Sequence, residues 1–508
     1  MKIVFSTLAL LSVVFVVNSY PFMYPAFDMW WHMAWIELAN EYHVNEIRVW
    51  HRLWSEIFEI INIEGFFEKS LIIHRAQFLV TFASVWAAGY LILRAVFIET
   101  SLRKVDLAVN SWFGVVIWLI INGSISMSRG GPGYSVTTQS WISWYSINYQ
   151  ISLPIYLLTT AGLLYLVAVP ARKAVKIGLA ISVAVGVVMI ALIHSAEIPY
   201  FILASIFIWI LYARGKAGLY VTLIASTLTV AGIYIGIKYS PKYPEFLRYT
   251  INRDWIGLLE KIQQYSQWLV HEDGNRAQTS WNTGTTISLT FAIITLGISL
   301  FNRQMLSVKP ILFIIMTSLM PMMIFHETSA GLLAMVTHLE IVWRFSFASF
   351  LFIAIPMFFT ALGLIMYQKR YKLLTPLLIS ITITLMVVHS IWCDPKRIVF
   401  TYAKSIYNSL DPRRVYFGLS SEERNALIDI QKKLKEQNII EPLCVDSFTA
   451  YYLYFIMKYR NVYLTNNFDV LPNDVYKPGK CSLSAENNDL KKLGLDLIQW
   501  RYDIRPHW

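Results

Sequence analysis

Residues 172–193 are RKAVKIGLAISVAVGVVMIALI: three basic side chains within five positions, then an uncharged apolar run from 177 to 193. A helix needs roughly 20 mainly apolar residues to cross a bilayer. Loops rich in Lys and Arg beside such spans face the cytoplasm. This segment therefore predicts a membrane-spanning helix that starts on the cytoplasmic side.

Apolar runs of similar length recur along the chain, and we predict about eleven spans from them. They lie at about 3–20, 76–98, 107–124, 150–169, 177–193, 199–213, 219–238, 284–301, 310–325, 345–366 and 375–392. The first run could instead be a signal peptide cleaved after Ser19. We favour a retained span, because the run has almost no polar segment before that site.

The composition excludes an ordinary soluble protein. Of 508 residues, 56% are hydrophobic and only 15% are charged, and the mean hydropathy is +0.49. Such values are typical of a polytopic helical membrane protein. The net charge is +11, but the basic residues lie in short loops and form no basic domain face, so we expect no nucleic-acid partner.

The loops between the spans alternate in charge. The short basic ones contain Arg103-Lys104, Arg172-Lys173-Lys176, Arg214-Lys216, Arg303-Lys309 and Lys369-Arg370-Lys372. The positive-inside rule places these loops and the N-terminus in the cytoplasm. The longer loops at 21–75, 125–149, 239–283 and 326–344 and the tail then lie outside the cell membrane. Large outer loops favour a protein that works at the outer membrane surface.

The first outer loop contains YPFMYPAFDMWWHMAWIELANEYH, from Tyr20 to His43. If residues 29–40 are helical, Asp28 and His32 are four apart and share one side of the first turn. A carboxylate among aromatic rings at a membrane boundary is costly unless it has a use. In the alternative interpretation, Asp28 is only a helix cap and the Trp residues form an interfacial belt. Apolar residues at helical spacing over 47–61 predict a second helix, which lies in the interface plane or packs on other spans.

Two other outer loops contain candidates for anion binding. Arg344 stands at the start of a Phe-rich span on the non-cytoplasmic side, where positive charge is unexpected, so it either reaches toward the interface or holds a phosphate. Arg129 beside a Gly-Pro-Gly turn could also meet a phosphate, although a plain turn is the favoured interpretation. The other polar candidates near Arg344 are His326, Glu327, His338 and Glu340. The third outer loop predicts a surface helix at 246–265. Its His271-Glu272-Asp273 triplet resembles a metal cluster, although three adjacent side chains on a loop rarely converge on one ion.

The tail, 394–508, is not apolar. Ser420 and Glu423 form a capping box before an amphipathic helix, and the segments around 440–447, 450–458 and 461–467 predict a strand, a helix and a strand. We therefore expect residues 1–393 to form the membrane domain and 394–508 a small α/β domain outside the membrane. Cys444 and Cys481 could pair in an oxidising compartment, but the connectivity is not determined.

Two short motifs resemble the GT-C superfamily of polytopic membrane glycosyltransferases, and YfhO-like and 6-pyruvoyl-tetrahydropterin-synthase-related bacterial membrane proteins in particular. The first is Pro25-Ala26-Phe27-Asp28-Met29-Trp30-Trp31-His32, followed by Ala34-Trp35-Ile36-Glu37-Leu38-Ala39. The second is Val342-Trp343-Arg344-Phe345. The DxD and WWDYG signatures of oligosaccharyltransferases are absent, which argues against that branch.

The resemblance implies an inverting transferase in a bacterial inner membrane, with a polyprenyl-phosphate sugar as donor and a glycan or lipid as acceptor. Asp28, with His32, would be catalytic as general base, or Asp28 would help to hold Mg²⁺ or Mn²⁺. Arg344 and Arg129 would bind the donor phosphate. Two alternatives stay open. One is a non-catalytic assembly or transport protein for lipid-linked oligosaccharides, and the other is a glycan polymerase or ligase that uses a diphosphate-linked donor. The sequence does not name the sugar, the acceptor or the oligomeric state.

The loop pattern predicts the topology directly. A reporter fused after Lys176 should lie in the cytoplasm, and a reporter fused after Asn275 should lie outside the membrane. Alkaline phosphatase and green fluorescent protein fusions would measure this, and an exported Lys176 fusion would contradict the predicted orientation.

Overall fold

The computed structural model describes residues 32–33, 35–37, 39, 49–64, 66–98, 102–122, 147–193, 197–213, 252–268, 283–319, 327–336 and 349–368, together with short pieces at 415–416, 419–420, 443–445, 462–464 and 483–484 and the single positions 7, 100, 227, 230–231, 234, 249, 432 and 436. The chain divides into two compact units. The first contains Met1–Val14, Gln77–Ser143 and Asn148–Tyr402, and the second contains Phe15–Ala76, Trp144–Ile147 and Ala403–Trp508.

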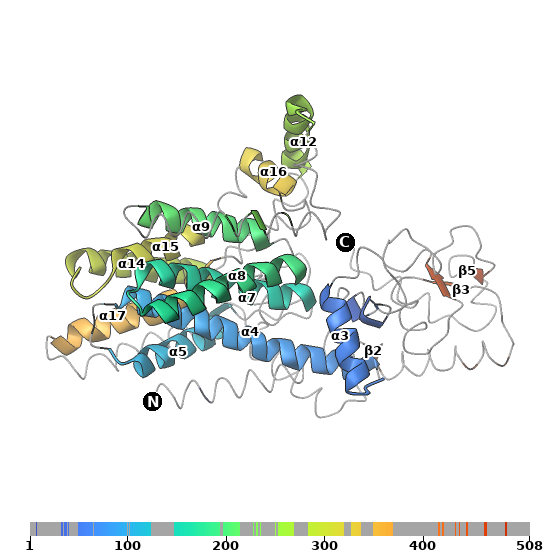
Figure 1. Cartoon of the computed structure of the whole chain (residues 1–508), viewed down its shortest axis with the longest axis horizontal. Helices are drawn as coiled ribbons and strands as arrows, with labels where there is room; N and C mark the ends of the chain where they lie inside the picture. The colour runs from blue at the N-terminus through green and yellow to red at the C-terminus, as the bar shows by residue number, and fades with distance from the viewer. Residues whose placement is uncertain are drawn as a thin grey trace. The chain divides into compact units, whose positions relative to one another are not determined.

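The first unit is helical where it is described (Figure 1). Its helices are α4 (Phe66–Val96, which begins in the second unit), α5 (Lys104–Asn122), α7 (Ile147–Ala168), α8 (Lys173–Ile193), α9 (Ile198–Tyr212), α12 (Trp255–Trp268), α14 (Thr283–Phe301), α15 (Val308–Ser318), α16 (Glu327–Val336), the 3-10 turn η6 (Leu351–Ile353) and α17 (Ala354–Gln368). Helices α9, α15, α14, α17 and α5 pack in that order, and α8 packs on α9.

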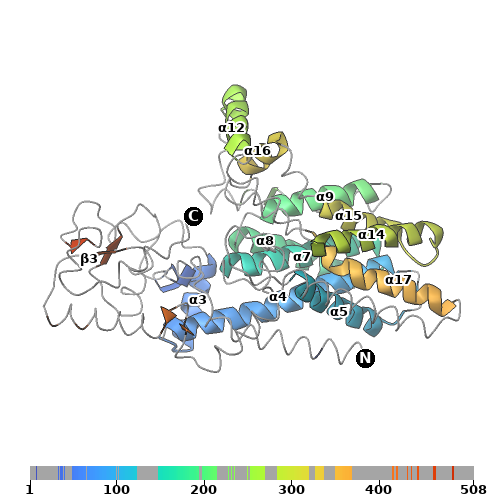
Figure 2. The same cartoon turned by 180° about the vertical axis from the view of Figure 1, so that it is seen from behind.

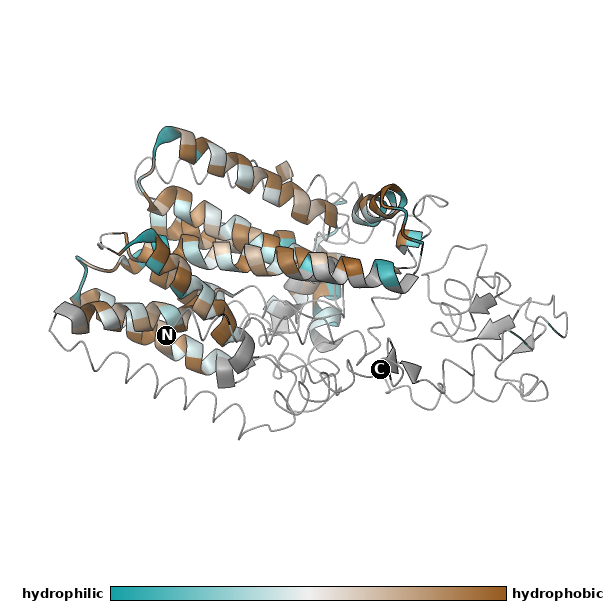
Figure 3. Cartoon of the chain, turned by 90° about the horizontal axis from the view of Figure 1, so that it is seen from below, coloured by the Kyte–Doolittle hydropathy of each residue, from teal (hydrophilic) through white to brown (hydrophobic). Residues whose placement is uncertain are grey.

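Three helices are long and apolar enough to cross a membrane, namely Leu79–Val96 within α4, Ile151–Ala168 within α7, and α8. On α8, Ile177, Ile181 and Val185 recur every four residues and are 51%, 59% and 55% exposed. Such an apolar stripe would be unfavourable in water but matches lipid. Figure 3 shows brown, apolar residues along the helices and teal, polar ones gathered toward several helix ends. The chain is therefore a mostly helical protein that associates with a membrane.

Most predicted spans that fall on described residues are helical, with shifted ends. Helix α4 begins at Phe66, ten residues before the predicted span and inside the predicted first loop. In the predicted span 310–325, the described residues form part of α15 and a turn at Leu319, and residues 320–325 lie outside the described residues. In the predicted span 345–366, the described part begins at 349 and becomes α-helical at Ala354. The predicted spans 3–20, 219–238 and 375–392 lie outside the described residues apart from Thr7, Thr227, 230–231 and Tyr234.

Aromatic and aliphatic side chains join α5, α14 and α17. Phe113 and Ile117 of α5 form a buried cluster with Ile355 and Phe359 of α17. Phe291 of α14 packs against this cluster. Interdigitated side chains of this kind hold helices together in lipid, where burial from water contributes little between helices.

Small residues bring α4, α5, α7 and α8 close together. The indole Nε1 of Trp86 on α4 donates to the Ala108 carbonyl of α5 at 2.9 Å, and Ser111 Oγ donates back to the Trp86 carbonyl at 2.7 Å. On α8, a Cβ added at Gly186 would collide with the Thr159 side chain of α7. Close backbone approach through Gly, Ser and Thr is typical of membrane helix pairs.

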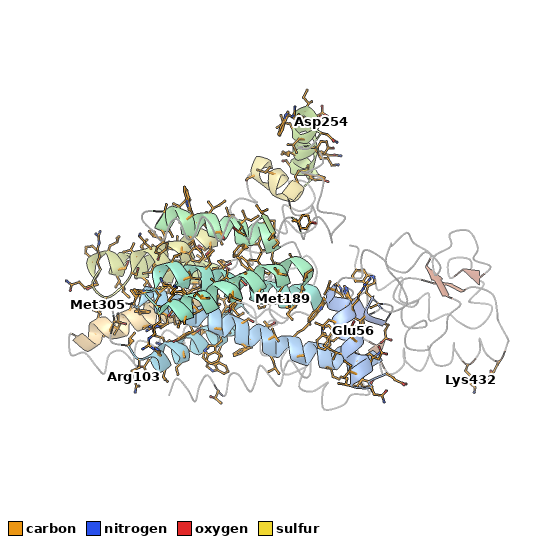
Figure 4. All side chains as sticks on the ribbon, viewed as in Figure 1. Glu56, Arg103, Met189, Asp254, Met305 and Lys432 are labelled. Carbon is orange, nitrogen blue, oxygen red and sulfur yellow. The ribbon has the colours of Figure 1, made fainter. Side chains whose placement is uncertain are left out.

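Helices α12 and α16 lie side by side (Figures 1 and 2). A Cβ at Gly331 of α16 would collide with the Ile262 carbonyl of α12. Within the helix predicted at 246–265, Tyr249 is helical and α12 begins at Trp255, after Arg253 takes a left-handed φ of 55°. Asp254 caps α12, because its carboxylate accepts the Gly257 N–H at 3.0 Å. Figure 4 labels Asp254 at this end of α12. Helix α16 lies in a segment predicted to be a loop.

The second unit contains α3 (Val49–Ile60) and short strands. Strands β1 (Val415–Tyr416) and β2 (Leu419–Ser420) pair antiparallel, and β3 (Leu443–Val445) pairs in parallel with β4 (Val462–Leu464) and β5 (Leu483–Ser484). β3 and β4 fall in segments predicted to be strands. The helix expected between them lies outside the described residues, so the α/β domain stays a prediction. In the predicted tail helix, Lys432 and Glu436 are helical and their charged groups lie 3.8 Å apart.

Gly186→Ala should destabilise the packing of α7 on α8 by about 1–3 kcal/mol, because the Thr159 side chain must move to admit the new methyl group. Gly178→Ala on the same helix is the matched control, since a Cβ there meets no atom within 4 Å. Alanine also favours the helix over glycine, so the control should be neutral or slightly stabilised. Unfolding midpoints of the two variants in detergent would measure the difference, and equal midpoints would contradict the close contact.

Candidate functional site

The candidate site lies within the second unit, on the loop that follows the first predicted span. Residues 32–33 and 35–37 are helical, as predicted for 29–40, and the Ala39 N–H donates to the Ile36 carbonyl at 3.3 Å. Met33, Ile36 and Ala39 are buried, so one face of this short helix is packed. That packing fixes the directions in which His32, Trp35 and Glu37 project.

Helix α3 supplies the opposite wall. Trp50, His51, Trp54 and Phe58 are buried, whereas Leu53 is 43% exposed. Figure 4 labels Glu56, which projects from α3 and is exposed. The helix predicted at 47–61 is present, and its aromatic face is packed rather than open.

Two histidines meet between these helices. Nδ1 of His32 lies 3.0 Å from Nε2 of His51, which is hydrogen-bond distance. The His51 side chain is fully buried and His32 is 8% exposed. The Trp35 ring presents an edge-to-face contact to each imidazole, with centroid distances of 5.0 and 5.2 Å. The site therefore holds a titratable pair in an aromatic, largely dry setting.

A ladder of rings continues along α3. Trp50 contacts Trp54 at 5.5 Å and Trp54 contacts Phe58 at 5.4 Å, measured between ring centroids. The Lys69 ammonium of α4 lies 5.7 Å from the Phe58 ring and 2.7 Å from Glu37 Oε1. This ion pair joins the helical turn that carries His32 to the first turns of α4.

Two buried indole donors on this ladder have no hydrogen-bond partner among the described residues. They are the Nε1 groups of Trp50 and Trp54. A buried N–H without an acceptor costs free energy, so such groups gain when a ligand supplies an oxygen. Aromatic rings with N–H groups at their edges suit a ligand that has both apolar faces and hydroxyl or phosphate oxygens.

Of the predicted site residues, the structure describes the side chain of His32 alone. Glu327 begins α16, and its side chain is outside the described set. The remaining predictions lie outside the described residues: Asp28, Arg129, His326, His338, Glu340 and Arg344. Their roles, including a metal at Asp28, stay predictions, as do the surface triplet at 271–273 and a pairing of Cys444 with Cys481.

The structure adds residues that the sequence did not single out as functional. His51 lies in the helix predicted at 47–61 and Glu37 in the first motif, and the sequence named neither as a site residue. Glu197, at the start of α9 in the first unit, is a fully buried carboxylate between the predicted spans 177–193 and 199–213. Spacing alone could not pair His32 with His51, because they lie 19 positions apart in the chain and on separate helical segments.

Within the described part of the chain, His, Cys, Asp and Glu side chains form no group of three that could hold a metal. Comparisons with protein-family models, with curated proteins and with solved structures give no match to this chain. The site must therefore be interpreted from its own residues.

The Glu37–Lys69 pair should couple the His32 turn to α4. Both side chains are mostly buried, at 15% and 13% exposure, so Glu37→Gln alone leaves an uncompensated ammonium and should cost about 2–4 kcal/mol of unfolding free energy. Adding Lys69→Met should recover much of that loss. A double-mutant cycle measured by denaturant unfolding tests this, and additive single-variant effects would show that the two groups do not interact.

Proposed function

We propose that this chain is a membrane glycosyltransferase of the GT-C type. It transfers a sugar from a polyprenyl-phosphate donor to a glycan or lipid acceptor at the outer face of the membrane. The observation that carries this proposal is the buried His32–His51 pair beside Trp35. It places a proton-accepting group of the motif-bearing loop in a buried, aromatic environment.

The proposed chemistry needs a base, an anion site and apolar walls. Asp28 takes the proton of the acceptor hydroxyl as its oxygen bonds to the anomeric carbon, and the bond from that carbon to the donor phosphate oxygen breaks. The leaving phosphate keeps the electron pair, and Arg344 and Arg129 are proposed to stabilise its charge. His32, four residues from Asp28, then receives the proton.

The rings and donors on α3 support a ligand of this chemistry. A sugar presents an apolar face to an aromatic ring, and its hydroxyl oxygens or the phosphate can accept from the buried indole N–H groups of Trp50 and Trp54. These groups lie on the same loop as Asp28. A divalent cation, Mg²⁺ or Mn²⁺, at Asp28 remains part of the proposal and would neutralise charge on the donor phosphate.

The wider architecture is proposed on the same basis. It has about eleven spans, a cytoplasmic N-terminus in a bacterial inner membrane, and an extracytoplasmic α/β domain at 394–508. The three spanning-length helices and the short parallel strands of the tail support this arrangement.

Asp28→Asn should abolish the activity while the protein still accumulates. The amide cannot accept a proton, so a loss of at least about a hundredfold is expected for a general base. The measurement is the surface-glycan profile of a deletion strain complemented with wild type or variant at equal expression.

Glu59→Gln is the matched control, because Glu59 is an exposed acid on the same loop. It should restore the glycan as wild type does. Full restoration by Asp28→Asn would remove the catalytic role of Asp28 and leave a non-catalytic assembly or transport role as the better interpretation.

A further inference from the structure

We propose that His51 completes a two-imidazole proton relay with His32, in which the proton that reaches His32 is passed on to His51. Its place in catalysis depends on the proposed transferase function, whereas the relay geometry does not. His51 is a positioning and proton-storing residue in this proposal, since it touches His32.

The geometry of the pair is that of an in-plane hydrogen bond. The two ring planes differ by 15° and the centroids lie 5.2 Å apart. The centroid distance exceeds the 3.0 Å between Nδ1 and Nε2 by 2.2 Å, which is about the sum of the two ring radii. Both nitrogens therefore lie close to the line between the centroids, and the rings meet edge to edge rather than face to face.

That alignment sets the proton count. One nitrogen must donate and the other must accept, because two N–H groups facing each other at 3.0 Å would repel. The pair therefore carries at most three protons on its four nitrogens, one of them between the rings. When the pair is charged, that central proton can belong to either imidazole.

The same alignment argues against a metal ion held between these two nitrogens. Zinc lies about 2.0–2.1 Å from a histidine nitrogen. Half of the 3.0 Å separation is 1.5 Å, so an ion on that line would be far too close to both atoms. The gap between the two nitrogens is wide enough for a shared proton but too narrow for a metal ion on the same line.

The surroundings favour a stored proton over exchange with water. His51 has no exposed surface, and the Trp35 ring covers both imidazoles from one side. The charged groups described on the packed elements are Arg52, Glu56 and Glu59 of α3, Glu68 of α4, and the ion pair of Glu37 with Lys69. That pair is internally neutral, and Glu56, Glu59 and Glu68 are exposed to solvent.

The step balances within the two rings. Before it, His32 carries a proton on Nδ1 that is donated to His51 Nε2, and His51 carries one on Nδ1. Protonated Asp28 gives its proton to Nε2 of His32. The Nδ1 proton of His32 then moves across the hydrogen bond to His51. His32 ends neutral with its proton on Nε2, and His51 ends as the imidazolium.

Solid-state NMR of the full chain tests the geometry. The protein would be labelled with ¹⁵N-histidine and placed in phosphatidylethanolamine–phosphatidylglycerol vesicles. The wild-type protein should show a ¹⁵N–¹⁵N coupling across the His32–His51 hydrogen bond. The coupling should be lost in His51→Gln. It should be kept in the control variant His74→Gln, which changes a histidine on α4. A wild-type spectrum without that coupling, or two neighbouring histidines that each gain a proton independently, overturns the relay.

Complementation tests the role. The amide introduced by His51→Gln can still accept the His32 N–H but cannot take up a proton. This variant should therefore lower the rate of glycan restoration about tenfold to a hundredfold at equal protein level. His74→Gln should match wild type. If His51→Gln restores the glycan at the wild-type rate, the relay is overturned, even where Asp28→Asn is inactive. If Asp28→Asn is fully active, the transferase proposal is overturned, but the NMR result on the histidine pair still holds.

Discussion

A lipid bilayer offers no hydrogen-bond partners, and this constraint shapes the apolar helices of the first unit. Each polar backbone group in lipid must be paired within its own segment, so the apolar stretches can fold only as helices. Helices in lipid then associate through close packing, which explains why glycines and hydroxyls stand where α4, α5, α7 and α8 meet. Ser111 illustrates this, because its hydroxyl pairs with a carbonyl of the neighbouring helix.

The same constraint acts at the candidate site, where aromatic side chains rather than lipid exclude water. His32 and His51 are tolerated there because one imidazole donates a hydrogen bond that the other accepts. Glu37 and Lys69 are tolerated because their opposite charges neutralise each other. The two unpartnered indole N–H groups on α3 are the exceptions among the described residues of this site. A ligand gains most binding free energy where it supplies the hydrogen bond that a buried polar group lacks.

Hydropathy predicted the helices well because it reports the bilayer constraint directly, as the match of α8 to its apolar run shows. Helix ends were less predictable: the helix predicted at 246–265 is interrupted at Arg253, whose φ is left-handed, before α12 begins, and α4 starts early because a helix can extend beyond the apolar run. For the site, spacing placed His32 on a helix but could not find His51. Contacts between separate helices depend on packing directions that a local pattern does not contain.

The polar residues inside the described spans bear on the choice between surface chemistry and transport. A transporter needs polar groups at mid-depth that are available to a passing substrate. Here Ser182, Thr295 and Thr360 donate instead to carbonyls of their own helices, at 2.9, 2.7 and 2.6 Å. These three hydroxyls therefore complete packed helices, whereas the buried hydroxyls of Ser205 on α9 and Ser288 on α14 have no hydrogen-bond partner among the described residues. Among the described residues, the concentrated titratable chemistry is the His32–His51 pair on the loop after the first predicted span, which is the placement that transfer at a membrane face requires.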